Sequence, residues 1–133
     1  MELVLDTSAL LAVLTQQPER AELLLLSKGA TLVAPASLHW EIGNVLSAMF
    51  KRRAIKLGQA VKLLDAYRQV SIRLVTPSLE QAVELSSSLN IYAYDAYVLA
   101  CAVNQRAPIL SLDRGLIERA RAVGVDCLEV KIS

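Results

Sequence analysis

Two carboxylates directly follow short apolar runs that have the length of β-strands. Asp6 comes after Leu3-Val4-Leu5, and Asp113 comes after residues 109–112. Taken singly, such an acid is most often the N-cap of the following helix. In an open α/β sheet, however, ligands bind beyond the carboxyl ends of the strands, where the strand order reverses. If the two runs are neighbouring strands, Asp6 and Asp113 face each other across a ligand crevice.

Two further acids lie inside predominantly apolar segments. Glu41 follows Leu38-His39-Trp40 in a helical stretch, and Asn44 would share its face three residues on. Asp95 is the only charged residue between positions 85 and 105. A carboxylate in such surroundings costs free energy unless it has a partner. Asp95 could equally be a cap of the helix that begins there.

Taken together, the four acids predict a cation site. Carboxylates about 5 Å apart repel each other by roughly 3 kcal/mol per pair at an effective dielectric near 20, and a divalent cation would compensate for this. Oxygen ligands favour Mg²⁺ or Mn²⁺, and the sequence contains no Cys/His cluster of the kind that zinc prefers. Beside a phosphate, such an ion orients a water molecule, lowers its pKa and neutralises charge on phosphoryl oxygens. The chemistry indicated is that of a nuclease.

Other phosphate-binding α/β folds lack their signatures in this sequence. A P-loop requires a glycine-rich turn ending in Lys-Ser/Thr after the first strand, but Asp6-Thr7-Ser8-Ala9 contains no glycine. A phosphatase of the haloacid dehalogenase type would have a second aspartate at position 8, which is a serine. The five glycines are scattered and form no dinucleotide-binding fingerprint.

The elements that would position the acids alternate between strands and helices. Short runs rich in Val, Ile and Leu have strand length at residues 3–5, 31–33, 71–75, 109–112 and 125–130. Segments between them have helical spacing. Because right-handed crossovers between parallel strands place helices on both faces, we predict a three-layer α/β/α fold with a five-stranded parallel sheet.

Length and composition predict one domain over residues 1–133. Hydrophobic residues make up 54% of the chain, enough for a sizeable core, but the longest uncharged stretches have only 12 residues, too few to span a membrane. No basic region precedes the first apolar run, so we expect no secretory signal. Two cysteines without metal-ligand spacing fit a reducing compartment. We therefore expect a cytoplasmic protein with no membrane partner.

The net charge of +1 conceals an uneven distribution. Residues 51–73 contain seven basic side chains and one acid, a net +6, so the rest of the chain carries −5. This basic stretch could attract RNA, bind an acidic segment of a protein partner, or only be solvated. Trp40, Tyr92, Tyr94 and Tyr97 could stack on bases, although core or dimer packing is the favoured interpretation.

Four segments resemble, in order and spacing, the acidic motifs of PIN domains. They are residues 6–10, 41–46, 94–100 and 111–116. The resemblance covers essentially the whole chain, and a free-standing domain of this size is similar to the toxin of a VapBC-type toxin–antitoxin pair. It implies the strand order 3-2-1-4-5 and a Mg²⁺- or Mn²⁺-dependent endoribonuclease. Such toxins are usually homodimers, inhibited by a small VapB-like antitoxin whose tail enters the acidic groove.

The resemblance also implies roles for individual residues. The catalytic and metal-binding positions are matched by Asp6, Glu41, Asp95 and Asp113. Among them, Glu41 matches the acid that often acts through a metal-bound water. The polar positions that brace the carboxylates are matched by Thr7 or Ser8, Asn44 and Ser111. Ser111 departs from the threonine more usual there, but either hydroxyl can form the hydrogen bond.

Two alternatives remain open at this point. The first is a catalytically silent RNA- or protein-binding module that kept the acidic pocket, and the presence of all four acids argues against it. The second is a processing or quality-control ribonuclease without a toxin role. Its active site would be identical, so only the effect of expression on growth, or the genomic context, separates it from a toxin.

Overall fold

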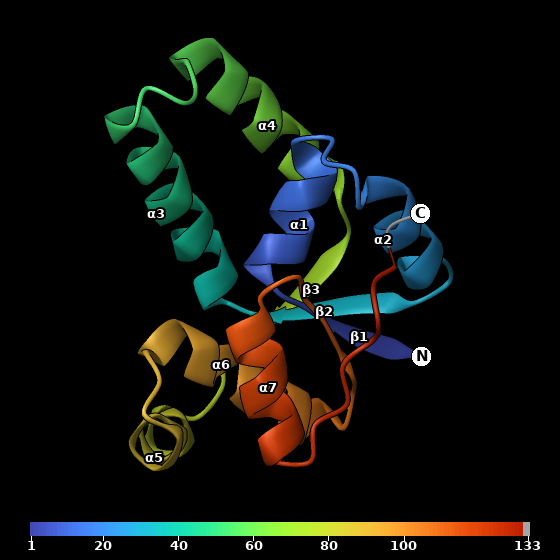
Figure 1. Ribbon diagram of the computed structural model, residues 1–133, viewed down its shortest axis with the longest axis vertical. Helices are drawn as coiled ribbons and strands as arrows, with labels where there is room; N and C mark the ends of the chain where they lie inside the picture. The colour runs from blue at the N-terminus through green and yellow to red at the C-terminus, as the bar shows by residue number, and fades with distance from the viewer. Residues whose placement is uncertain (132–133) are drawn as a thin grey trace.

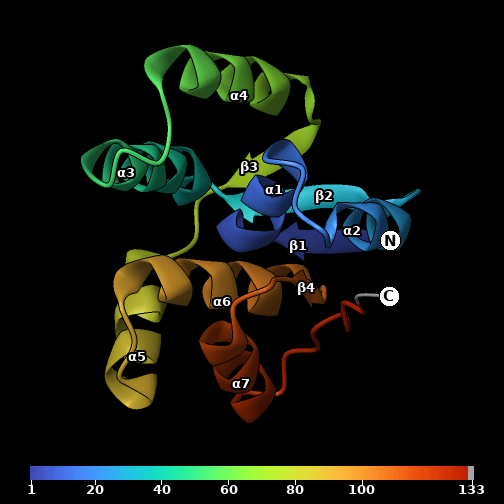
Figure 2. The same cartoon turned by 45° about the horizontal axis from the view of Figure 1, so that its top comes forward.

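The computed structural model describes residues 1–131 and has three layers, with a parallel sheet between two layers of helices (Figures 1 and 2). The strands are β1 (Glu2–Leu5), β2 (Thr31–Pro35), β3 (Ile72–Val75) and β4 (Ile109–Leu110). The helices are α1 (Thr7–Leu14), α2 (Arg20–Ser27), α3 (Ser37–Lys51), α4 (Leu57–Gln69), α5 (Leu79–Leu89), α6 (Ala93–Gln105) and α7 (Arg114–Ala122). Helices α1 to α4 lie on one side of the sheet and α5 to α7 on the other, which confirms the predicted α/β/α class.

The sheet has the order β3-β2-β1-β4, as predicted for these four strands. β1 pairs in parallel with both β2 and β4, with Val4 opposite Val33 on one side and Ile109 on the other. The strand order reverses between β1 and β4. The residues that follow these two strands therefore lie side by side at the carboxyl edge of the sheet.

The prediction of a fifth strand at residues 125–130 is wrong. In the described part of the chain, this segment contributes a single parallel bridge between Ile109 and Cys127. Ile109 N–H donates to the carbonyl of Asp126, and Leu128 N–H donates to the carbonyl of Ile109, both at 2.9 Å. The pairing does not continue to Leu110, so residues 125–130 add one bridge at the edge of the sheet and not a fifth strand.

The core consists of two apolar clusters, one on each face of the sheet. The alternation of side chains along β1 divides them: Leu3 and Leu5 join one cluster, and Val4 joins the other. On α3, the buried residues recur every four positions, at Leu38, Ile42 and Leu46. Within residues 1–131, none of the helices combines the length and apolar character needed to cross a bilayer.

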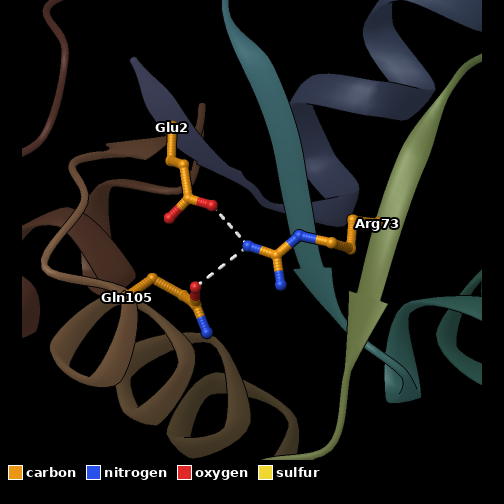
Figure 3. A network of polar contacts seen from close by, with 3 residues as sticks. All are labelled: Glu2, Arg73 and Gln105. Atoms are coloured by element: carbon orange, nitrogen blue, oxygen red, sulfur yellow. Dashed lines mark hydrogen bonds and ion pairs between the residues drawn. The ribbon is translucent and has the colours of Figure 1, made fainter.

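A polar network joins two strands and a helix at the amino-terminal half of the sheet (Figure 3). The guanidinium of Arg73, on β3, reaches across β2 to the carboxylate of Glu2 on β1, and it donates to Oε1 of Gln105 on α6 at 3.1 Å. Arg73 is one of the basic residues of the stretch 51–73, and Glu2 balances its charge. The cluster Lys51, Arg52 and Arg53 lies exposed at the end of α3.

Candidate active site

Asp6 is held at the carboxyl edge of the sheet by two serine hydroxyls. It follows β1, and its side chain is only 5% exposed. Ser8 Oγ, from the first turn of α1, donates to Asp6 Oδ2 at 2.6 Å, and Ser111 Oγ, directly after β4, donates to the same oxygen at 2.7 Å. The backbone N–H of Leu112 donates to Ser8 Oγ at 3.0 Å. Within residues 1–131, no group donates to Asp6 Oδ1, so this oxygen is available to a ligand.

Asp113 caps α7 and is connected to Asp6 through Ser111. Its Oδ1 accepts a hydrogen bond from the backbone N–H of Leu116 at 3.2 Å, which confirms the interpretation of this acid as an N-cap. Its own N–H donates to Ser111 Oγ at 3.0 Å. A Cβ at Gly115 would lie 3.3 Å from Asp113 Oδ1, so glycine leaves room for the carboxylate there. Asp6 and Asp113 therefore lie next to each other beyond the ends of β1 and β4, with Ser111 hydrogen-bonded to both.

Glu41 and Asp95 belong to the same electrostatic cluster. Burial is the main cause that raises the pKa of the Glu41 carboxyl from 4.5 to about 7, and the charge of Asp6 adds to the rise. Asp95 and Asp113 also raise the pKa of Glu41, whereas a hydrogen bond with the Thr7 side chain lowers it. Burial raises the pKa of Asp95, with contributions from Asp113 and Asp6. Asp6 and Asp113 therefore lie close enough for their charges to raise the pKa of both Glu41 and Asp95.

The structure thus brings four separate elements to one acidic cluster. The acids come from the end of β1, from α3, from the first turn of α6 and from the N-cap of α7. Within residues 1–131, no three acidic, histidine or cysteine side chains are spaced to hold a metal ion. Asn44 is exposed, and no hydrogen bond in the described residues joins its side chain to the acids.

The chemistry of these donors fits a hard divalent cation. In the part of the chain that the structure describes, the ion pairs are Arg68–Asp65 and Arg73–Glu2, and neither includes an acid of the cluster. The cluster therefore holds several carboxylates whose charge no basic side chain balances. Hydroxyl and carboxylate oxygens are ligands that Mg²⁺ and Mn²⁺ accept.

Comparison with protein families identifies the chain. The PIN domain model matches residues 3–122. The chain belongs to the PIN domain family. A comparison with curated proteins gave no significant match. PIN-domain nucleases generally use divalent metal ions, and the donors of the acidic cluster agree with this property of the family.

Solved structures support the same fold. A chain of Rickettsia felis VapBC2, solved with a DNA fragment from its promoter, superposes with a TM-score of 0.72 at 17% identity, over 98% of this PIN domain and 100% of that chain. Mycobacterium tuberculosis VapC20, a toxin that cleaves the sarcin-ricin loop, gives 0.65 at 14% identity, over 96% and 98% of the two chains. PAE2754 from Pyrobaculum aerophilum gives 0.66 at 17% identity, over 90% and 86%. At these identities, the similarity establishes the PIN fold.

The raised pKa of Glu41 predicts how the stability of this PIN domain depends on pH. The folded state retains the proton of Glu41 up to about pH 7, whereas the unfolded state loses it near 4.5, so ionisation of Glu41 lowers the free energy of unfolding as the pH rises between these values. Glu41→Gln removes this effect. In EDTA, we expect the Tm of Glu41→Gln to be higher than that of the wild type. This difference in Tm should be smallest at pH 5 and largest at pH 8.

The control for this measurement is Glu118→Gln, which removes an exposed carboxylate of α7 outside the cluster. Thermal unfolding of the three proteins is followed by circular dichroism over the same pH range. A difference between Glu41→Gln and the wild type that stays constant from pH 5 to pH 8 would contradict the raised pKa.

Proposed function

We propose that this PIN domain is a Mg²⁺- or Mn²⁺-dependent endoribonuclease and the toxin of a type II toxin–antitoxin pair. The observation that carries the proposal is the cluster of Asp6, Glu41, Asp95 and Asp113, which lacks a basic partner in the described residues and lies at the carboxyl edge of a PIN fold. The structural similarity to VapC20 and to the VapBC2 chain supports the toxin role.

In this proposal, Asp6, Asp95 and Asp113 would hold the cation. When bound, the cation neutralises charge on phosphoryl oxygens and lowers the pKa of water. Ser8 and Ser111 both bond to Oδ2 of Asp6, which fixes the carboxylate and directs its other oxygen to the ligand. Supporting hydrogen bonds of this kind orient metal ligands in proteins.

Glu41 is assigned to the attacking water. Its side chain is only half-buried, so solvent reaches it, and the charges of Asp6, Asp95 and Asp113 act on its pKa. Glu41 would accept a proton from the water, whose oxygen attacks the phosphorus atom in line with the leaving oxygen. The bond from phosphorus to the 3′ oxygen breaks, and this oxygen takes up a proton from solvent. The products carry a 5′-phosphate and a 3′-hydroxyl.

Metal removal tests the proposed activity. The purified protein should cleave RNA in Mg²⁺ or Mn²⁺, and EDTA should reduce cleavage to the background of a protein-free sample, because the carboxylates alone repel the phosphate. Excess Mg²⁺ should restore the activity. Mapping of the cleaved ends should give 5′-phosphates. Cleavage that persists in EDTA, or products with cyclic phosphates, would contradict the mechanism.

The toxin role requires protein partners, and these form part of the proposal. The binding partner is a small VapB-like antitoxin whose tail enters the acidic groove, and the active form is a homodimer. Leu24 and Leu25, exposed on α2, supply an apolar surface of the kind that subunit interfaces cover.

Expression should arrest growth, and co-expression of the antitoxin from the neighbouring reading frame should relieve the arrest. Cleavage of RNA without any effect on growth would favour a processing or quality-control ribonuclease.

A further inference from the structure

An uncharged pocket of about 480 Å³ lies between the beginnings of α3 and α6 and the loop that follows β3. Aromatic rings supply much of its wall: Trp40 from α3, and Tyr94 and Tyr97 from α6. Ser37 and Thr76 also line this pocket. None of the lining residues carries a charge. The pocket therefore suits a planar, neutral group with polar edges rather than a phosphate or a carboxylate.

The pocket adjoins the acidic cluster through both of its helices. Trp40 is the chain neighbour of Glu41, and Tyr94 is the chain neighbour of Asp95. The Cα atoms of such neighbours are about 3.8 Å apart. Consecutive side chains on a helix point about 100° apart, so the pocket and the acids lie on adjoining faces of α3 and α6. A nucleotide next to a phosphate at the acids could then reach the aromatic rings.

The aromatic rings are accessible. Trp40 is 67% exposed, and its ring makes an edge contact with His39, with the ring centroids 4.9 Å apart. Tyr94 is 37% exposed and makes a T-shaped contact with Tyr97. In the described residues, no ring stacks face to face on Trp40. A large indole in this state has a free face for a ligand.

We propose that this pocket binds an unstacked base of the RNA strand next to the scissile phosphate, with Trp40 as its main stacking surface. The inference rests on the proposed ribonuclease function, and it adds a base-binding site to the acidic cluster. Stacking of splayed bases on aromatic side chains is the usual way in which proteins bind single-stranded RNA. The hydroxyls of Ser37 and Thr76 can accept or donate hydrogen bonds at the base edge, so they would contribute to base preference.

The single tryptophan of the chain makes the proposal directly measurable. The protein is mixed in Mg²⁺ with a short single-stranded oligoribonucleotide in a stopped-flow fluorimeter, which reads the emission of Trp40 within milliseconds. A comparison oligomer has the same length and charge but abasic sugars. We expect the base-containing RNA to quench the emission and the abasic oligomer to leave it unchanged. Equal quenching by both would overturn the proposal.

Substitution of Trp40 provides the second arm. Trp40→Ala should raise the KM for cleavage about 5- to 140-fold, the range expected for loss of one stacked base, and change kcat by less than about threefold. Trp40→Phe should recover most of the affinity because it keeps an aromatic face. Phe50→Ala is the matched control, since Phe50 is an exposed aromatic residue at the other end of α3. It should leave KM and quenching unchanged.

The remaining outcomes separate this proposal from its rivals. If Trp40→Ala converts a dimer to a monomer in light scattering and the wild type shows no base-dependent quenching, the pocket is a protein interface and the proposal fails. Base-dependent quenching by a protein that cleaves no RNA would refute the ribonuclease function but support the base site. Cleavage without base-dependent quenching would support the ribonuclease and refute the base site.

Discussion

Asp95→Asn should lower the rate of RNA cleavage at least about 100-fold, since even groups that only support metal ligands contribute about 10- to 100-fold. Asp95 lies in the first turn of α6, and burial together with the charges of Asp113 and Asp6 raises its pKa. An asparagine has nearly the same shape but removes a negative charge from the cluster. The metal-free variant should therefore unfold at the same temperature as the wild type or at a higher one.

Two measurements check this prediction together: cleavage of a labelled RNA in Mg²⁺, and thermal unfolding in EDTA. Asp65→Asn is the matched control, because Asp65 is an exposed acid of α4 that pairs with Arg68 outside the cluster. It should leave cleavage unchanged. Full activity of Asp95→Asn would exclude Asp95 from the active site, and a lower Tm would show that the carboxylate stabilises the fold.

Leu99→Ala should lower the free energy of unfolding by about 2–5 kcal/mol. Leu99 is completely buried, one helical turn after Asp95, in the cluster that α6 forms with Val4 and Val33 of the sheet. The substitution removes apolar contacts and leaves a cavity between α6 and the strands. Because a small domain is stable by only about 5–15 kcal/mol, this loss would be a large fraction of the total.

Urea denaturation measures this effect, with Val103→Ala as the control. Val103 lies one turn further along α6 and is 41% exposed, so its truncation should change the free energy of unfolding by less than about 0.5 kcal/mol. Equal losses for the two variants would mean that α6 does not pack on the sheet through Leu99. Such a result would remove the support for the position of Asp95.

The parts of the fold that depend on local pattern were predictable from the sequence. Apolar runs of strand length between helical segments identify β1 to β4, and their parallel arrangement brings Asp6 beside the loop after β4. The fifth strand was not predictable in this way. Residues 125–130 have a strand-like composition, but a strand also requires a continuous backbone ladder with a neighbour, and this segment pairs with β4 only at Ile109 and Cys127.

Details of the candidate site required three-dimensional structure. The sequence could not decide whether Thr7 or Ser8 braces a carboxylate, whereas in the structure Ser8 donates to Asp6 and the side chain of Thr7 lowers the pKa of Glu41. Both residues lie at the start of α1, and their partners depend on where α3 and β4 pack. Core or dimer packing is the interpretation that the sequence favours for the aromatic residues. Trp40 lies outside the core of this chain, because the buried face of α3 passes through Leu38 and Ile42.

Arg73 also affects the edge of the sheet that β3 forms. β3 is the outermost strand on its side, and a strand in that position can recruit another chain by backbone pairing. Its four residues include an arginine that points over the sheet toward Glu2 (Figure 3). A short border strand with an inward-directed charge is a known safeguard against self-association through β-pairing. The same contact that links β3 to β1 thus helps to keep neighbouring molecules from extending the sheet into a polymer.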